Sequence, residues 1–203
     1  MARHLVEQGA EYLHLVDLDG ARDGKPANLE SIAAIAQAVD IPCELGGGIR
    51  EEQAIAELLE LGLSRLVIGT QAVAKPDWFR EMCHRFPHKM ALGIDARDGW
   101  VATHGWLETS QLRGTELARQ FADEPVAAII FTDIATDGML AGPNIESLVE
   151  MRQATRLPLI ASGGVTTAAD VSRLEEISVD GCIIGRSLYE GKITLAEVYA
   201  ALG

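Results

Sequence analysis

The feature that most constrains this chain is an internal repeat, in which landmarks of the first half recur 116 residues later. The segment DGKPANLESI at 23–32 resembles DGMLAGPNIESL at 137–148. A constant offset over several landmarks indicates a duplicated half-domain rather than chance similarity. The matched landmarks are Asn28 and Asn144, Gly47 and Gly163, and Gly69 and Gly185.

Short apolar, β-branched runs alternate with longer helical patterns along the whole chain. Near-continuous apolar runs are typical of parallel strands that are covered on both faces, and repeated βα units give a parallel sheet. A duplicated half suits a closed (β/α)₈ barrel, because two four-unit halves face each other there. The predicted strands are Tyr12–Asp17, Ile41–Leu45, Arg65–Gly69, Met90–Asp95, Ala127–Thr132, Leu157–Ala161 and Asp180–Gly185.

The repeat also predicts a strand that residues 1–203 do not contain. The second half starts with the strand Met90–Asp95, and the counterpart of this strand would fall before residue 1. The first half starts inside the helix that matches the one predicted near Gly114–Asp123. We therefore expect an α/β fold, a TIM-type barrel with its first strand missing and seven strands visible. It forms one domain, 1–203, with half-barrels at about 1–89 and 90–203.

Four glycine-containing turns follow apolar strands and precede helices, at the end of a barrel where active sites form. Glycine lets backbone N–H groups approach and cradle a phosphate, although tight turns alone also use glycine. Because the turns form two symmetric pairs, we expect two phosphate sites and a substrate with a phosphate at each end. The expected contacts are Gly47, Gly48, Gly69 and Thr70 in one site and Gly163, Gly164, Gly185 and Arg186 in the other.

Three acids, Asp17, Asp95 and Asp137, lie at or just past predicted strand ends and are candidates for proton transfer or substrate contact. A carboxylate in the barrel mouth can act as a general acid or base, whereas the alternative is capping a turn or helix. A glycine follows Asp137, so a turn role is equally well supported there. Asp95 is the favoured catalytic residue, because Asp98 and Gly99 make the turn that follows it.

Three further residues lie near these acids in the expected barrel. The Thr132 hydroxyl could bond the substrate or orient Asp137, although threonine also suits a strand for structural reasons. Trp106 could stack on a planar heterocycle, with packing in the core or a lid as the alternative. His104 is a weaker candidate for a phosphate or ring contact.

Composition narrows the classes of partner. The formal net charge of −13 disfavours nucleic acid and anionic membranes, but helix N-termini bind phosphate whatever the global charge. No apolar run approaches the roughly 20 residues of a membrane helix, and the N-terminus carries no signal-peptide pattern. The three cysteines are scattered without a metal-binding pattern, so we expect no metal, no cofactor and reduced thiols in the cytoplasm.

Taken together, the motifs resemble those of the phosphoribosylformimino-aminoimidazole carboxamide ribotide isomerases of histidine biosynthesis, from residue 1 to residue 203. The resemblance implies an Amadori rearrangement of a bisphosphorylated substrate without a cofactor. It implies that Asp95 is the acid that opens the aminoaldose ring, that Thr132 and Asp137 assist, and that Trp106 lies on a mobile loop. The motifs are HLVDLDGA (14–21), GGGIR (46–50), VIGT (67–70), GIDARDG (93–99), GWLE (105–108), FTDIATDGMLAGPN (131–144), ASGGV (161–165) and IIGRSLYEGK (183–192).

The chain departs from this family in one respect. The resemblance places the base that takes the C2 proton on an aspartate of strand one, and residues 1–203 hold no such segment. Two interpretations stay open: an incomplete version of an ordinary isomerase, or a shortened barrel that binds phosphosugars without turnover. A bifunctional isomerase that also serves tryptophan synthesis is a third possibility. We expect a monomeric parent, whereas open strand edges would let the shortened chain self-associate.

Overall fold

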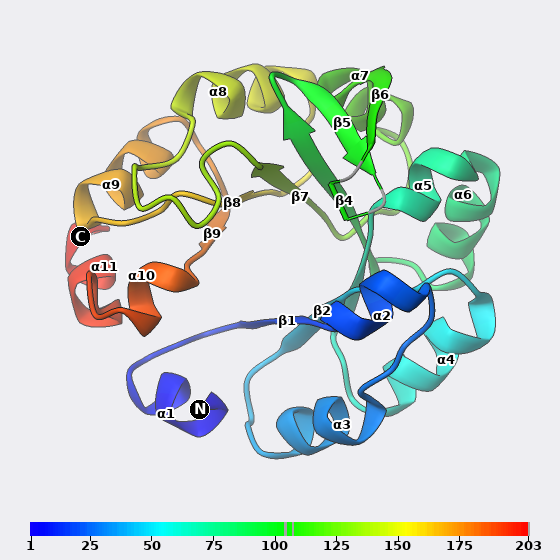
Figure 1. Ribbon diagram of the computed structural model, residues 1–203, viewed down its shortest axis with the longest axis horizontal. Coiled ribbons are helices and arrows are strands. Elements are labelled where there is room, and N and C mark those ends of the chain that lie inside the picture. Colours follow the sequence, from blue (N-terminus) through cyan, green and yellow to red (C-terminus); the bar gives the residue numbers. More distant parts are fainter. Residues whose placement is uncertain (104, 107, 203) are drawn as a thin grey trace.

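Seven parallel strands form a nearly closed barrel in the computed structural model, which describes residues 1–103, 105–106 and 108–202. His104, the weaker contact candidate, lies outside the described residues. The strands pair in the order β1-β2-β3-β4-β7-β8-β9, and Figure 1 shows them surrounded by the helices. All seven were predicted. They are β1 Leu13–Val16, β2 Cys43–Gly46, β3 Arg65–Ile68, β4 Met90–Arg97, β7 Ala128–Asp133, β8 Leu159–Ser162 and β9 Gly181–Ile183.

Helices connect the strands and cover the outside of the barrel. Their ends agree with several sequence signals: Pro76 opens α6, and Thr194 forms a capping box with Glu197. Gly62, with φ +98°, follows the end of α4 as predicted. The helices are α1 Ala2–Glu7, α2 Leu18–Asp23, α3 Leu29–Gln37, α4 Glu52–Glu60, α5 Thr70–Ala74, α6 Pro76–Arg85, α7 Gly114–Gln120, α8 Ile145–Ala154, α9 Ala168–Glu176, α10 Arg186–Tyr189 and α11 Leu195–Ala201.

The repeat seen in the sequence is also a repeat of structure. Strands β2 and β8 are related by the 116-residue offset at both ends, and so are helices α4 and α9. The helix caps at the matched residues Asn28 and Asn144 nevertheless differ. The Asn144 side chain accepts the backbone N–H of Ser147, whereas the Asn28 side chain makes no such cap.

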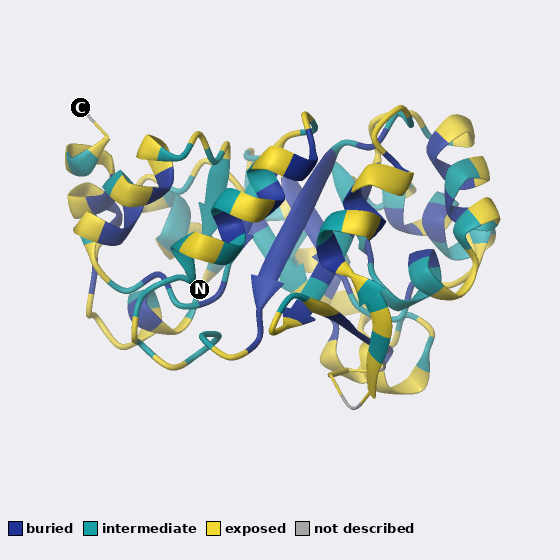
Figure 2. Cartoon of the chain, turned by 90° about the horizontal axis from the view of Figure 1, so that it is seen from above, coloured by how far each residue is buried: buried dark blue, intermediate teal, exposed yellow. Residues whose placement is uncertain are grey.

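The core lies between the barrel wall and the helices. Alternate strand residues such as Leu45, Leu66, Leu92 and Ile94 are fully buried there, and Figure 2 shows buried residues along the strands and on the helix faces turned toward them. The other strand face points into the barrel, as the alternation of side chains requires. Gly93 lies close to the neighbouring strand, because an added Cβ there would come within 3.1 Å of the Val67 Cγ1.

A hairpin that the sequence analysis did not predict extends β4 beyond the barrel mouth. Strand β4 pairs antiparallel with β5, Trp100–Thr103, which pairs with β6, Glu108–Arg113. The turn at Asp98 and Gly99 links the first two, with φ +52° and +78°. The hairpin thus carries Trp106 over the end of β4.

Strands β1 and β9 are the two ends of the pairing path, and in the described part of the chain they do not pair with each other. This is the position at which the repeat predicts an eighth strand. None of the described helices combines the length and apolar character that crossing a membrane would require.

Candidate active site

Three of the predicted site residues meet at the carboxyl end of β4. Asp95 on β4 and Thr132 on β7 are direct neighbours in the register of the two strands. The Thr132 hydroxyl hydrogen-bonds the Asp95 carboxylate, and the Trp106 indole Nε1 donates to its other side at 2.9 Å. The hairpin therefore places an aromatic ring directly on the acid favoured from the sequence.

The environment of Asp95 favours its protonated form. Burial raises the pKa of Asp95, and the nearby charge of Asp137 acts in the same direction. Hydrogen bonds from Trp106 and Thr132, and the charge of His14, lower it, but the net pKa shift is upward. A carboxyl group whose pKa is raised by burial can carry a proton at higher pH than an exposed one, which suits a general acid.

Asp137 lies in the loop between β7 and α8, where its backbone N–H donates to the Asp133 carbonyl at 3.1 Å. The loop turns at Gly138, with φ +68°, so the turn role considered for this acid is present. Its side chain also lies against Gly163, where an added Cβ would come within 3.2 Å of the Asp137 Cβ. Asp137 thus both shapes a turn and lines the site.

One of the two predicted phosphate sites coincides with a cavity of about 240 Å³. Arg186 closes one side, and its guanidinium donates to the Gly138 carbonyl at 2.6 Å and pairs with Glu190 at 2.5 Å. Both contacts hold the arginine at the rim of the cavity. Arg186 therefore forms a salt bridge with Glu190 and also gives the cavity a charged wall. The predicted residues that line the cavity are Asp137, Gly163, Gly164, Gly185 and Arg186.

The other predicted phosphate site has the same backbone arrangement. Gly69 begins α5 with φ −106° and ψ −90°, and Gly185 begins α10 with φ −108° and ψ −95°. Thr70 and Arg186 are the first residues of α5 and α10, so the two helices begin with equivalent backbone turns. The first N–H groups of a helix have no partner within the helix and can bind a ligand. Two-fold symmetry of the chain has therefore produced two similar backbone cradles on opposite sides of the mouth.

The paired glycines have a second reason to be glycine. A Cβ on Gly47 would collide with the Asp17 carbonyl oxygen, and one on Gly48 with the Gly20 carbonyl. Gly164 would collide with the Gly142 carbonyl in the same way. Close approach of the neighbouring loop thus requires glycine at these positions, independently of any phosphate.

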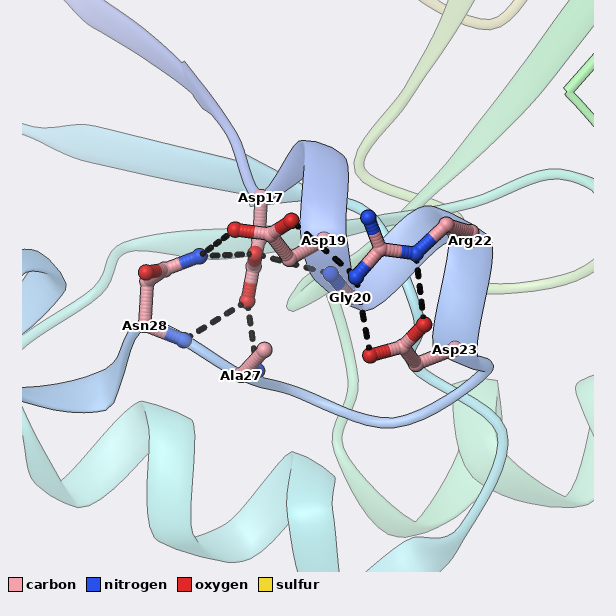
Figure 3. A network of polar contacts seen from close by, with 7 residues as sticks. All are labelled: Asp17, Asp19, Gly20, Arg22, Asp23, Ala27 and Asn28. Carbon is pink, nitrogen blue, oxygen red and sulfur yellow. Dashed lines mark hydrogen bonds and ion pairs between the residues drawn. The ribbon is translucent and has the colours of Figure 1, made fainter.

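Asp17 has a different place from the substrate contact expected for it. It is 3% exposed, and its carboxylate accepts four hydrogen bonds within its own loop (Figure 3). The donors are the backbone N–H groups of Gly20, Ala27 and Asn28 and the Asn28 amide, at 2.7–3.1 Å. Burial opposes ionisation, but these bonds outweigh it and lower the pKa of Asp17 to about 2. The carboxylate thus holds the loop closed.

The second half repeats this arrangement with a residue that the sequence analysis missed. Asp133, 116 residues after Asp17, accepts the Ala135 backbone N–H at 2.9 Å and the Asn144 amide at 2.6 Å. We call the two pairs, Asp17 with Asn28 and Asp133 with Asn144, the loop clasps. The 116-residue offset applied to Asp17 leads to Asp133, so the repeat in the sequence was sufficient to find this residue.

The inside of the barrel holds a second group that the sequence analysis left without a role. His14, Glu44 and Arg65 lie on β1, β2 and β3 and are joined by ion pairs. For metals, the described residues contain no group of three or more His, Cys, Asp or Glu side chains placed to bind an ion.

Comparison with known proteins gives one consistent result. The family described as "Histidine biosynthesis protein" matches residues 1–194. Relatives named 1-(5-phosphoribosyl)-5-((5-phosphoribosylamino)methylideneamino) imidazole-4-carboxamide isomerase include those of Crocosphaera subtropica and Picosynechococcus, each 52% identical over 206 residues. The relative of Rhodopirellula baltica is 50% identical over 205 residues. These alignments cover 100% of this chain and 80–81% of each relative.

Proposed function

The chain belongs to the histidine biosynthesis protein family, and from this premise we propose that it is an isomerase that converts a bisphosphorylated aminoaldose to an aminoketose. Relatives that are at least half identical to it carry an isomerase name, and they align with its whole length. The observation that carries the proposal is the position of a partly buried, hydrogen-bonded Asp95 between two symmetric backbone cradles.

The substrate named for the relatives contains two phosphoribosyl groups. This chemistry fits the two cradles, one at Gly47, Gly48 and Gly69 and the other at Gly163, Gly164 and Gly185. Each phosphate would accept hydrogen bonds from backbone N–H groups. Arg186 would add a charged donor at the site formed by Gly163, Gly164 and Gly185. A ligand held at both ends would have its central ribose over the barrel mouth, beside Asp95.

Asp95 is proposed as the general acid. Its proton goes to the ring oxygen of the aminoaldose as the bond from C1 to that oxygen breaks, which leaves a protonated Schiff base. The positive nitrogen makes the C2 proton acidic, and a base removes it to form an enolamine. Protonation at C1, with loss of the proton of the C2 hydroxyl, then gives the aminoketose, so no atom or electron is gained or lost and no cofactor is required.

The residues around Asp95 have supporting roles in this proposal. Thr132 and Trp106 hold the Asp95 carboxyl group in one orientation through their hydrogen bonds. The negative charge of Asp137 raises the pKa of Asp95 and so helps to keep Asp95 protonated. The indole of Trp106 is 40% exposed and is available to stack on the substrate. The base for the C2 proton is expected on the strand that residues 1–203 do not include.

An isomerase assay of Asp95→Asn, made in the full-length parent that includes the first strand, tests the proposal. A general acid acts mainly in the transition state, so kcat should fall by roughly 10²–10⁴-fold while KM changes little. The control is Asp98→Asn, which makes the same chemical change in an exposed turn three residues away. If Asp95→Asn keeps turnover within a few-fold of the parent, Asp95 is only a structural strand-end acid.

A further inference from the structure

A row of charged side chains crosses the barrel interior below the mouth. His14, Glu44 and Arg65 occupy paired positions on three adjacent strands, since His14 is in register with Glu44 and Glu44 with Arg65. Glu44 is 1% exposed, and its two carboxylate oxygens contact the His14 Nδ1 at 2.7 Å and the Arg65 Nε. Arg65 in turn lies over the Tyr12 ring, 4.6 Å from its centroid.

The second half of the barrel has apolar residues where the first half has this charged row. The same offset leads from His14 to Ile130, from Glu44 to Ile160 and from Arg65 to Gly181, and these residues share the same register. An apolar row thus fills the equivalent place. Buried ion pairs cost desolvation energy, and well-packed apolar residues often serve stability as well or better. The charges therefore point to a task other than holding the barrel together.

The pairing fixes the hydrogen-bonding state of His14. Burial opposes ionisation of Glu44, but hydrogen bonds from His14 and Arg65 outweigh it, so the pKa of Glu44 is lowered and the group is a carboxylate. A carboxylate can only accept, so His14 Nδ1 must donate. In the neutral ring this leaves Nε2 as the unprotonated nitrogen, and among the described residues nothing pairs with it.

We propose that Glu44, held in turn by Arg65, positions the His14 imidazole beneath the barrel mouth with Nδ1 as donor, so that Nε2 is presented to the acids around Asp95. The chemical purpose of this arrangement rests on the proposed function, whereas its geometry does not. Because only one half of the repeat carries this row, the row also makes the two halves of the barrel chemically different.

The effect of His14 on the pKa of Asp95 supports this assignment. The groups that face Asp95 are Trp106 from the hairpin, Thr132 on β7, Asp137 in the following loop and His14 on β1. Among them His14 is the one ionisable group that lowers the pKa of Asp95. The groups that face His14 are Glu44 directly and Arg65 through it.

The first test is the tautomer of His14, measured by ¹⁵N NMR of the imidazole in the full chain. At a pH where the ring is neutral, Nδ1 should be the protonated nitrogen. The double variant Glu44→Ile with Arg65→Gly installs the residues of the second half and removes both charges together. The fixed tautomer should then be lost, and circular dichroism checks that the fold is kept. An unchanged ¹⁵N pattern in a folded variant would overturn the positioning role.

The second test is the titration of the Asp95 carboxyl carbon by ¹³C NMR in the parent chain and in His14→Asn. Because His14 lowers the pKa of Asp95, its removal should move the midpoint of Asp95 to higher pH. Glu52→Gln, which alters an exposed ion pair with Arg85, is the matched control and should leave the midpoint unchanged. A midpoint that does not move in His14→Asn overturns the proposal. Neither test needs turnover, so inactivity of a chain extended by its first strand would count against the proposed function and leave this proposal untouched.

Discussion

Replacing Asp17 with asparagine would remove the negative charge of the first loop clasp while keeping its shape. The pKa of the buried Asp17 is lowered from 3.8 to about 2. One pKa unit corresponds to about 1.4 kcal/mol, so ionised Asp17 contributes about 2 kcal/mol to the free energy of unfolding at neutral pH. The amide also turns an NH₂ group toward N–H donors, and the expected loss is therefore about 2–4 kcal/mol.

Urea unfolding at pH 7, followed by circular dichroism, measures this loss. The control is Asp19→Asn, whose carboxylate is half exposed and makes one bond to Asn28 at 3.2 Å and one ion pair with Arg22. Exposed pairs contribute little, so the control should stay within about 1 kcal/mol of the parent. Equal stability of Asp17→Asn and its parent would show that the clasp does not hold the loop in solution.

The pH dependence gives a second, independent readout of Asp17. Its folded pKa lies below its unfolded value, so its contribution is full above pH 4–5 and is lost as pH falls toward 2. The parent should therefore lose about 2 kcal/mol more than Asp17→Asn over this interval. Parallel stability curves for the two proteins would refute the reasoning.

Three further predictions concern the mouth and the open edge of the barrel. Trp106→Phe keeps a ring but removes the bond that lowers the pKa of Asp95, so the Asp95 midpoint in ¹³C NMR should rise; an unchanged midpoint would mean that the bond is absent in solution. Arg186→Ala should weaken inorganic phosphate binding at the Gly163–Gly164 cavity by about tenfold in calorimetry, as for loss of one charged hydrogen bond, and equal affinity would contradict the site. A chain extended by an N-terminal strand ending in aspartate should unfold at a higher urea concentration and turn over faster than residues 1–203. Comparable turnover in both chains would place the C2 base within residues 1–203, with Asp17 and Asp137 the first residues to test.

The barrel could be predicted because its signals are local and repeated. Apolar β-branched runs gave all seven parallel strands, and the 116-residue offset distinguished a barrel from an open sheet. The hairpin β5–β6 was missed because Glu108–Arg113 is polar and mostly exposed, so no hydrophobic period marks it. Its pairing with β4 depends on long-range register, which the composition of a short segment does not encode.

The site was predictable at its strand ends and less so at its contacts. Asp95 and Thr132 were both expected at strand ends, but Thr132 was expected to bond the substrate or to orient Asp137, whereas it contacts Asp95 on the neighbouring strand. The direction of the Asp17 side chain could not be predicted, because it depends on three backbone donors from a loop that closes back on it. Asn28 directly precedes α3, where asparagine commonly caps a helix, but its amide bonds Asp17 instead. Choosing between such partners requires the loop geometry.

The loop clasps and the charged row divide the barrel into features that its halves share and a feature that they do not. Both halves carry a clasp at equivalent positions, 116 residues apart, so loop closure is built the same way twice. The charged row of His14, Glu44 and Arg65 lies in the first half, and the equivalent positions of the second half are apolar. An exchange of the two halves would therefore preserve how the loops close and would move the charged row to the other side of the barrel.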